Sequence, residues 1–169
     1  MRAFRSVFFI VLTVISFPLR AGEGFCGIRN TSFQATEAIT FRVMYAVVGA
    51  HFGAGEVTFS TTLEMLNNKP VYHLTGEGKT YPFYDNIFKV RDKYESFIDT
   101  GTLQPYKFIR NVYEGGYKKY ENVTFNHSAK TATSNRGLFQ ITDCIQDVMS
   151  MVYYARNIDF KKKKKEDKI

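Results

Sequence analysis

The strongest constraint on this chain is an alternation of apolar and polar residues that recurs in short runs between turn residues. In ITFRVMYAVV, at 39–48, Phe41, Val43 and Tyr45 fall on one side of an extended chain. Successive side chains of a β-strand point to opposite faces, so this period of two predicts a half-buried strand. The chain has sixteen Phe, eleven Tyr and no Trp. Aromatic residues of this kind also favour strands.

The next runs predict antiparallel hairpins. GEVTFSTTLEML at 55–66 repeats the alternation, NNKP at 67–70 has the composition of a turn, and VYHLTGEGKT is the returning strand. Gly115 and Gly116 separate two further alternating runs, as residues of a tight hairpin turn do. In the first of these hairpins we expect four apolar side chains to face inward: Val57, Phe59, Leu63 and Met65.

The period changes once, near the end of the chain. Ile145, Val148, Met149 and Val152 follow helical spacing, and Asp143 with a glutamine three residues later resembles a capping box. The sequence therefore predicts a mainly β fold. It is a curved antiparallel sheet, shaped as a half-barrel or a β-roll, with one amphipathic helix near 143–157.

The N-terminus has the pattern of a secretory signal peptide. Basic residues precede an apolar run at 7–19 that is too short to span a bilayer. We expect residues 1–21 to be the signal peptide and 22–160 to form a single β-rich domain. The Lys-rich tail at 161–169 ends without completing an element, so we expect an incomplete domain and a truncated continuation. Export predicts a periplasmic or outer-envelope location, with no integral membrane segment after cleavage.

Cys26, soon after the apolar run, has three alternative roles: a lipid anchor, half of a disulfide, or an unpaired thiol. A lipoprotein signal requires a small residue directly before the cysteine, and Phe25 stands there, which disfavours lipidation. The chain has two cysteines, and an export signal would bring them into an oxidising compartment. A disulfide between Cys26 and Cys144 is the economical hypothesis.

The positive charge of the chain is concentrated at its two ends. The formal net charge is +7, but residues 22–160 carry as many basic as acidic side chains. A run of lysines is typical of a solvated segment, and the tail lacks the aromatic side chains that stack on bases. The composition therefore predicts no nucleic-acid partner.

The sequence has no signature of catalysis, of a cofactor or of a metal. The three histidines, His51, His73 and His127, have no carboxylate or cysteine at metal-ligand spacing. GEGKT at 76–80 lacks the first glycine and the following helix of a phosphate loop. We expect no catalytic, cofactor-binding or metal-binding residue, and the interpretation leans away from an enzyme.

Several segments, in their order along the chain, resemble a family of exported bacterial proteins. The segments are CGIRNTSFQ at 26–34, ITFRVMY at 39–45, AGEVTF at 54–59, VYHLTGEGKT at 71–80, KVRDKYESFID at 89–99, LQPYKFIRNVYEGGY at 103–117 and QDVMSMVYYARNIDF at 146–160. The chain resembles domain-of-unknown-function family 3108, especially its Bacteroidetes members. The resemblance implies a YmcC-like fold, in which a sheet curls around a helix, with further strands beyond Ile169.

The leading functional hypothesis is a non-catalytic scaffold or binding module of the cell envelope. Its partner would be a lipid, a glycan or another protein. Two alternatives stay open, namely a hydrolase or other enzyme that acts on envelope polymers, and a structural protein that binds through its sheet edges.

Overall fold

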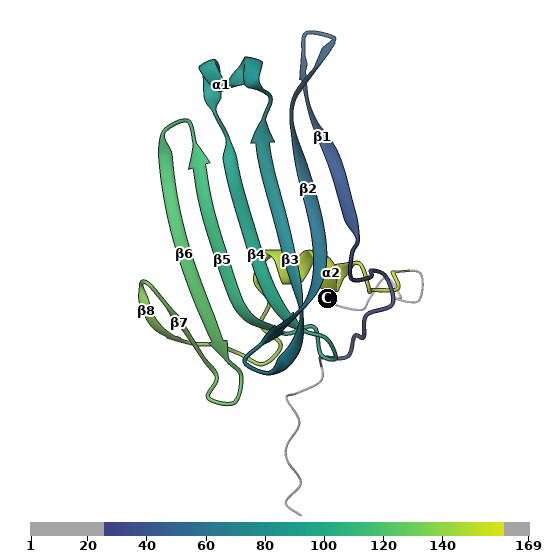
Figure 1. The fold of residues 1–169 in the computed structure, drawn as a ribbon, viewed down its shortest axis with the longest axis vertical. Helices are drawn as coiled ribbons and strands as arrows, with labels where there is room; N and C mark the ends of the chain where they lie inside the picture. The colour runs from purple at the N-terminus through teal and green to yellow at the C-terminus, as the bar shows by residue number, and fades with distance from the viewer. Residues whose placement is uncertain (1–25, 161–169) are drawn as a thin grey trace, which may run out of the picture.

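The computed structural model describes residues 26–160, which form one antiparallel sheet with two helices (Figure 1). The strands follow chain order: β1 (Ala38–Val47), β2 (Ala50–Leu66), β3 (Lys69–Thr80), β4 (Arg91–Asp99), β5 (Pro105–Glu114), β6 (Tyr117–Asn126), β7 (Thr131–Ser134) and β8 (Gly137–Gln140). The helices are α1 (Pro82–Phe88) and α2 (Val148–Ala155). The predicted mainly β fold is confirmed. The predicted signal peptide and Lys-rich tail lie outside the described residues.

Two tight turns set the register of the sheet as the sequence predicts. Asn67 and Asn68 join β2 to β3 with φ of 50° and 63°, and Gly115 and Gly116 join β5 to β6 with φ of 55° and 97°. Two consecutive positive φ angles give a turn whose twist matches that of the strands it joins. Asparagine and glycine adopt these angles at the lowest cost, so both hairpins form locally.

The register places one set of side chains under α2. Phe59 of β2 pairs with Gly76 of β3, which pairs in turn with Tyr94 of β4. Two residues further along the same face, Leu74 of β3 pairs with Ser96 of β4. Directly paired residues of antiparallel strands point to the same face. Helix α2 packs across this face, against β3 and β4. We call it the helix face, and the opposite side the outer face.

The core lies between the helix face, α2 and the segment that precedes β1. Its buried members are Phe33, Leu74, Ile98, Leu103, Phe108, Met149 and Tyr153. Phe33 sits edge-on to Tyr153, with ring centroids 4.9 Å apart. Burying such side chains contributes about 1.5–3 kcal/mol each, so this cluster fixes the helix on the sheet.

The prediction of four inward side chains on β2 is wrong for two of them, Leu63 and Met65. Leu63 and Met65 share a face with Phe59 but are 58% and 68% exposed, whereas Thr61 between them and Phe59 is buried. On this face, no element of the described chain buries the side chains of β2 beyond Thr61. Strand periodicity assigns a side chain to a face, but burial also requires a neighbour on that face.

Helix α2 is shorter than the helix predicted at 143–157. Its N-cap is Asp147, whose side chain accepts from the backbone of Met149 and Ser150, and the Ser150 hydroxyl accepts from the Asp147 backbone. Asp143 instead pairs with Lys130 at 2.8 Å. Cys144 has φ of 59°, outside the helical region, so no helix can start at Asp143. A second helix, α1, was not predicted; it is one short connection between β3 and β4.

Candidate functional site

An apolar groove runs between α2 and the helix face of the sheet. Its cavity measures about 240 Å³. The sheet contributes Val57, Phe59, Gly76, Gly78, Asp92 and Tyr94, and the helix contributes Val148, Met149 and Val152. A water molecule takes up about 30 Å³ in the liquid, so the groove has room for a short stretch of a slender apolar molecule.

Two glycines of β3 form the floor of this groove, and they have different roles. A Cβ atom on Gly76 would lie 3.0 Å from Sδ of Met149, so this glycine lets the helix approach the sheet. A Cβ atom on Gly78 would meet Val57 at 3.7 Å and Asp92 at 3.9 Å, which are ordinary contacts. Gly78 therefore leaves space that the fold does not use.

An exposed apolar strip continues the groove toward the edge of the sheet. Phe41 pairs with Val57 across β1 and β2, and its ring lies edge-on to Phe59 with centroids 6.1 Å apart. Phe41, Val43 and Tyr45 alternate along β1 and so share this face. Phe41 is 55% exposed and Tyr45 is 63% exposed. Contiguous apolar surface beside a groove is typical of a binding site.

Asp92 is the one charged residue among those that line the groove. Burial raises the pKa of its carboxyl, a hydrogen bond from the backbone N–H of Tyr113 (3.0 Å) opposes that rise, and the neighbouring Glu114 adds to it. Burial also raises the pKa of the Tyr94 hydroxyl. Both shifts show that this end of the groove is a less favourable place for a negative charge than water is.

Helix α2 is held beside the groove by polar contacts at both of its ends. At its start, the buried Ser96 donates to Asp147 at 2.6 Å. At its end, Arg156 forms a bidentate ion pair with Glu37, with N–O distances of 2.5 and 2.9 Å. The hydrogen bonds from Arg156 lower the pKa of Glu37. These contacts fix one wall of the groove.

The two cysteines, predicted from the sequence as a pair, are joined. Cys26 and Cys144 form a disulfide with Cα atoms 5.5 Å apart, and it closes a chain separation of 118 residues. The bond ties the segment before β1 to the segment that leads into α2. The Tyr154 hydroxyl donates to the carbonyl of Cys26 at 2.8 Å, so the helix itself is attached at the same point.

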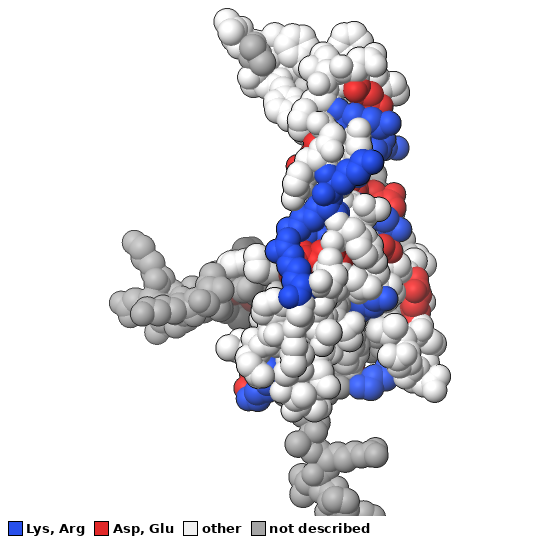
Figure 2. Space-filling model, turned by 90° about the vertical axis from the view of Figure 1, so that its left-hand side faces the viewer, with Lys and Arg blue, Asp and Glu red and all other residues white. Residues whose placement is uncertain are grey.

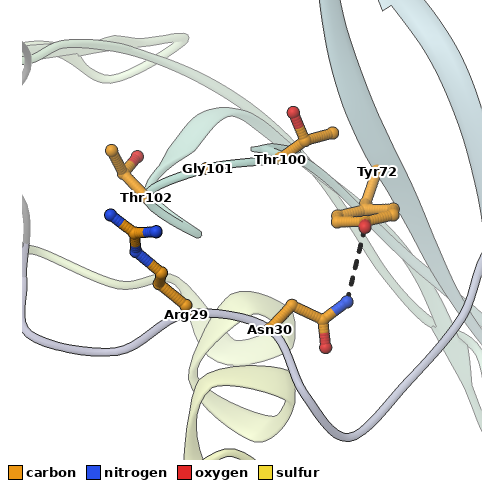
Figure 3. A pocket seen from close by; sticks show the side chains of 6 residues that line it. All are labelled: Arg29, Asn30, Tyr72, Thr100, Gly101 and Thr102. Carbon is orange, nitrogen blue, oxygen red and sulfur yellow. Dashed lines mark hydrogen bonds between the residues drawn. The ribbon is translucent and has the colours of Figure 1, made fainter.

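A second, polar pocket of about 590 Å³ lies at the end of the sheet where the segment before β1 passes the turn between β4 and β5 (Figure 3). We call it the polar pocket. It is lined by Arg29, Asn30, Tyr72, Thr100, Gly101 and Thr102.

The histidines lie apart from the groove. His73 is in β3 on the outer face, where its ring nitrogens contact Glu64 at 2.8 Å and Glu95 at 3.1 Å and its ring stacks on Phe97. His127, at the turn after β6, contacts the carbonyl of Pro105. Among residues 26–160, no group of three His, Cys, Asp or Glu side chains has the arrangement of a metal site.

The side of the molecule on which β6, β7 and β8 lie is shown in Figure 2. Basic side chains form a narrow band there, with acidic side chains beside it. Arg110 of β5 and Glu121 of β6 form an ion pair at 2.6 Å. No helix within the described part of the chain has the length and apolar character that crossing a membrane requires.

The fold and the groove define a class: an open, curved antiparallel sheet that holds one helix on one face, with an apolar groove beside that helix. The chain belongs to the family described as protein of unknown function (DUF3108), whose model matches residues 40–168. No curated protein and no solved structure matches the chain.

Proposed function

We propose that this chain is an exported, non-catalytic binding module of the cell envelope, and that its groove takes an acyl chain of an envelope lipid. The observation that carries the proposal is the groove itself, in which apolar side chains of β2 and α2 face each other over Gly78. An acyl chain is slender, flexible and apolar, and it gains about 0.8 kcal/mol for each methylene removed from water.

The exposed strip on β1 favours a lipid over a rigid small ligand. Phe41 adjoins the groove and Val43 and Tyr45 extend it along the strand, so an apolar chain longer than the groove would stay in contact with apolar side chains. An acyl chain of this length would also remove the apolar strip on β1 from water, which lowers the free energy of the complex further.

A binding experiment with a fluorescent fatty acid tests this proposal. Parinaric acid, whose fluorescence rises in apolar surroundings, is titrated into the oxidised protein and then displaced with decanoic acid. The variant Gly78→Val adds three carbons that would displace about three methylenes of the ligand. At about 0.8 kcal/mol each, the loss is about 2.4 kcal/mol, which weakens binding roughly fiftyfold.

The matched control is Glu77→Val, one residue away on the outer face of the same strand. Glu77 is exposed there and forms a 3.7 Å pair with Lys93, so the control adds the same side chain without entering the groove. We expect it to bind parinaric acid as the unmodified protein does. Equal binding by the Gly78→Val variant, or no fluorescence change at all, refutes the acyl site.

Export is a separate part of the proposal, supported by the basic and apolar pattern at the N-terminus and by the disulfide. Fractionation of a Gram-negative host tests it. We expect the protein in the envelope fraction, with its signal peptide removed. Its cysteines should resist alkylation until the disulfide is reduced. An unprocessed chain in the cytosol would contradict export.

The open edge of β1 supports a second candidate, a partner protein that adds a strand there. β1 is the first strand in the sheet order and ten residues long, so one of its sides is unpaired within the described sheet. Unpaired edges of this length readily accept another strand. If the Gly78→Val variant binds its natural ligand normally while a proline at Val43 abolishes binding, the edge is the site and the groove is not.

A further inference from the structure

The polar pocket has rigid walls on the side of the segment before β1. The Asn30 side chain accepts from the backbone N–H groups of Ser32 and Phe33 at 3.2 Å, and it donates to the carbonyl of Phe33 at 2.9 Å. The ring of Tyr72 stands edge-on to Phe33, with centroids 5.2 Å apart. Side chains held in this way lose little further freedom when a ligand binds.

The opposite wall is a turn that the Asp99 carboxylate organises from within. Asp99 accepts from the backbone of Gly101 (2.9 Å) and Thr102 (2.7 Å) and from the Tyr106 hydroxyl (3.0 Å). Burial alone would raise the pKa of Asp99, but these donors hold the pKa below its usual value. The carboxylate is therefore ionised and engaged inside the turn, and it is not among the groups that line the pocket.

Hydrogen-bond donors dominate the groups that do line the pocket. The Tyr72 oxygen accepts a hydrogen bond from Asn30 (3.4 Å), which leaves its own proton for another acceptor (Figure 3). Arg29 turns its guanidinium toward Thr102, on the opposite side of the pocket from Tyr72 (Figure 3). A guanidinium has five N–H donors, so it can serve a ligand in addition to a partner of its own.

We propose that the polar pocket binds an oxyanion, either a phosphate or a carboxylate. Arg29 supplies charge-assisted hydrogen bonds from one side of the pocket, while the Tyr72 hydroxyl donates from the other side. Two envelope sources carry this chemistry, the acidic sugars of a glycan and the phosphodiester of a lipid headgroup. The site is distinct from the apolar groove, so the inference does not depend on an acyl ligand.

The test follows backbone amide signals of the ¹⁵N-labelled, oxidised protein by NMR during titration. The probes are inorganic phosphate, glucuronate, glycerol 3-phosphate and, as a neutral comparison, glucose. We expect saturable shifts at Gly101 and Thr102 with the three anions at millimolar concentration and none with glucose. Tighter binding of glucuronate than of glycerol 3-phosphate assigns the site to an acidic sugar, and the reverse order assigns it to a lipid headgroup.

Two variants link these shifts to the pocket. Arg29→Gln removes the cation and is expected to weaken anion binding about tenfold to hundredfold, because hydrogen bonds to charged groups contribute about 1.5–3 kcal/mol. Arg136→Gln, at an exposed arginine in the turn between β7 and β8, is the matched control and leaves the affinity unchanged.

Three results would overturn the oxyanion site: no shift with any anion up to 50 mM (about the highest concentration that is practical), equal shifts with glucose, or equal affinity in the Arg29→Gln variant. The groove variant Gly78→Val separates this inference from the acyl proposal. It is expected to bind phosphate normally, so either site can fail without the other.

Discussion

Asp147 gives the sharpest test of how helix α2 is attached to the sheet. The substitution Asp147→Ala removes the acceptor for the N–H groups of Met149 (2.8 Å) and Ser150 (2.9 Å). Loss of an N-cap costs about 0.5–2 kcal/mol. It also leaves the Ser96 hydroxyl, which is fully buried, without the partner that now accepts at 2.6 Å. An orphaned buried donor costs about 1–3 kcal/mol.

One effect reduces this cost. Burial raises the pKa of Asp147, although hydrogen bonds from Ser96 and from the first turn of the helix oppose the rise. The buried carboxylate is thus less favourable than an exposed one, and its removal recovers part of that penalty. We expect a net loss of about 2–3 kcal/mol in the free energy of unfolding, since the cap and the orphaned hydroxyl together outweigh the recovered penalty.

Urea unfolding of the oxidised protein, followed by circular dichroism, measures the loss. The matched control is Asp143→Ala, which removes the residue that the sequence pattern predicts as the cap. Asp143 is exposed and its pair with Lys130 lies at the surface, so we expect a change below about 1 kcal/mol. The reasoning is refuted if the two variants lose equal stability, or if Asp147→Ala costs no more in the normal protein than in a Ser96→Ala background.

Two further predictions concern the covalent and the electrostatic attachments. Replacing both Cys26 and Cys144 with alanine is expected to lower the free energy of unfolding by about 3–5 kcal/mol, because the disulfide closes a long loop. Urea unfolding of this variant and of the reduced protein should give the same loss. An unchanged urea midpoint would contradict the prediction. The pKa of Asp99 in the folded protein lies below its usual value. The ionised carboxylate therefore stabilises the fold at any pH above that usual value, and this contribution disappears as the pH falls through the folded pKa. The stability deficit of Asp99→Asn should therefore be full near neutral pH and shrink below about pH 4; a deficit independent of pH would exclude the charge as its cause.

Local patterns in the sequence determined most of the sheet. The turns at Asn67–Asn68 and Gly115–Gly116 need positive φ, which asparagine and glycine supply, and the alternation in the flanking runs sets which side chains share a face. The cysteine pair also followed from the sequence, because a chain with two thiols allows a single intramolecular bond. Each of these features depends on neighbours in the chain or on simple counting.

The tertiary structure decided the features that depend on distant neighbours. The sequence places Leu63 on the same face as Phe59, but only the position of α2 leaves Leu63 in water and makes Gly78 the floor of a groove. Likewise, Asp147 caps the helix in place of Asp143, and Ser96, 51 residues earlier, donates a further hydrogen bond to its carboxylate. Whether a side chain is buried, and whether its polar atoms find partners, depends on how two elements pack against each other. The periodicity of one strand or helix does not specify that packing.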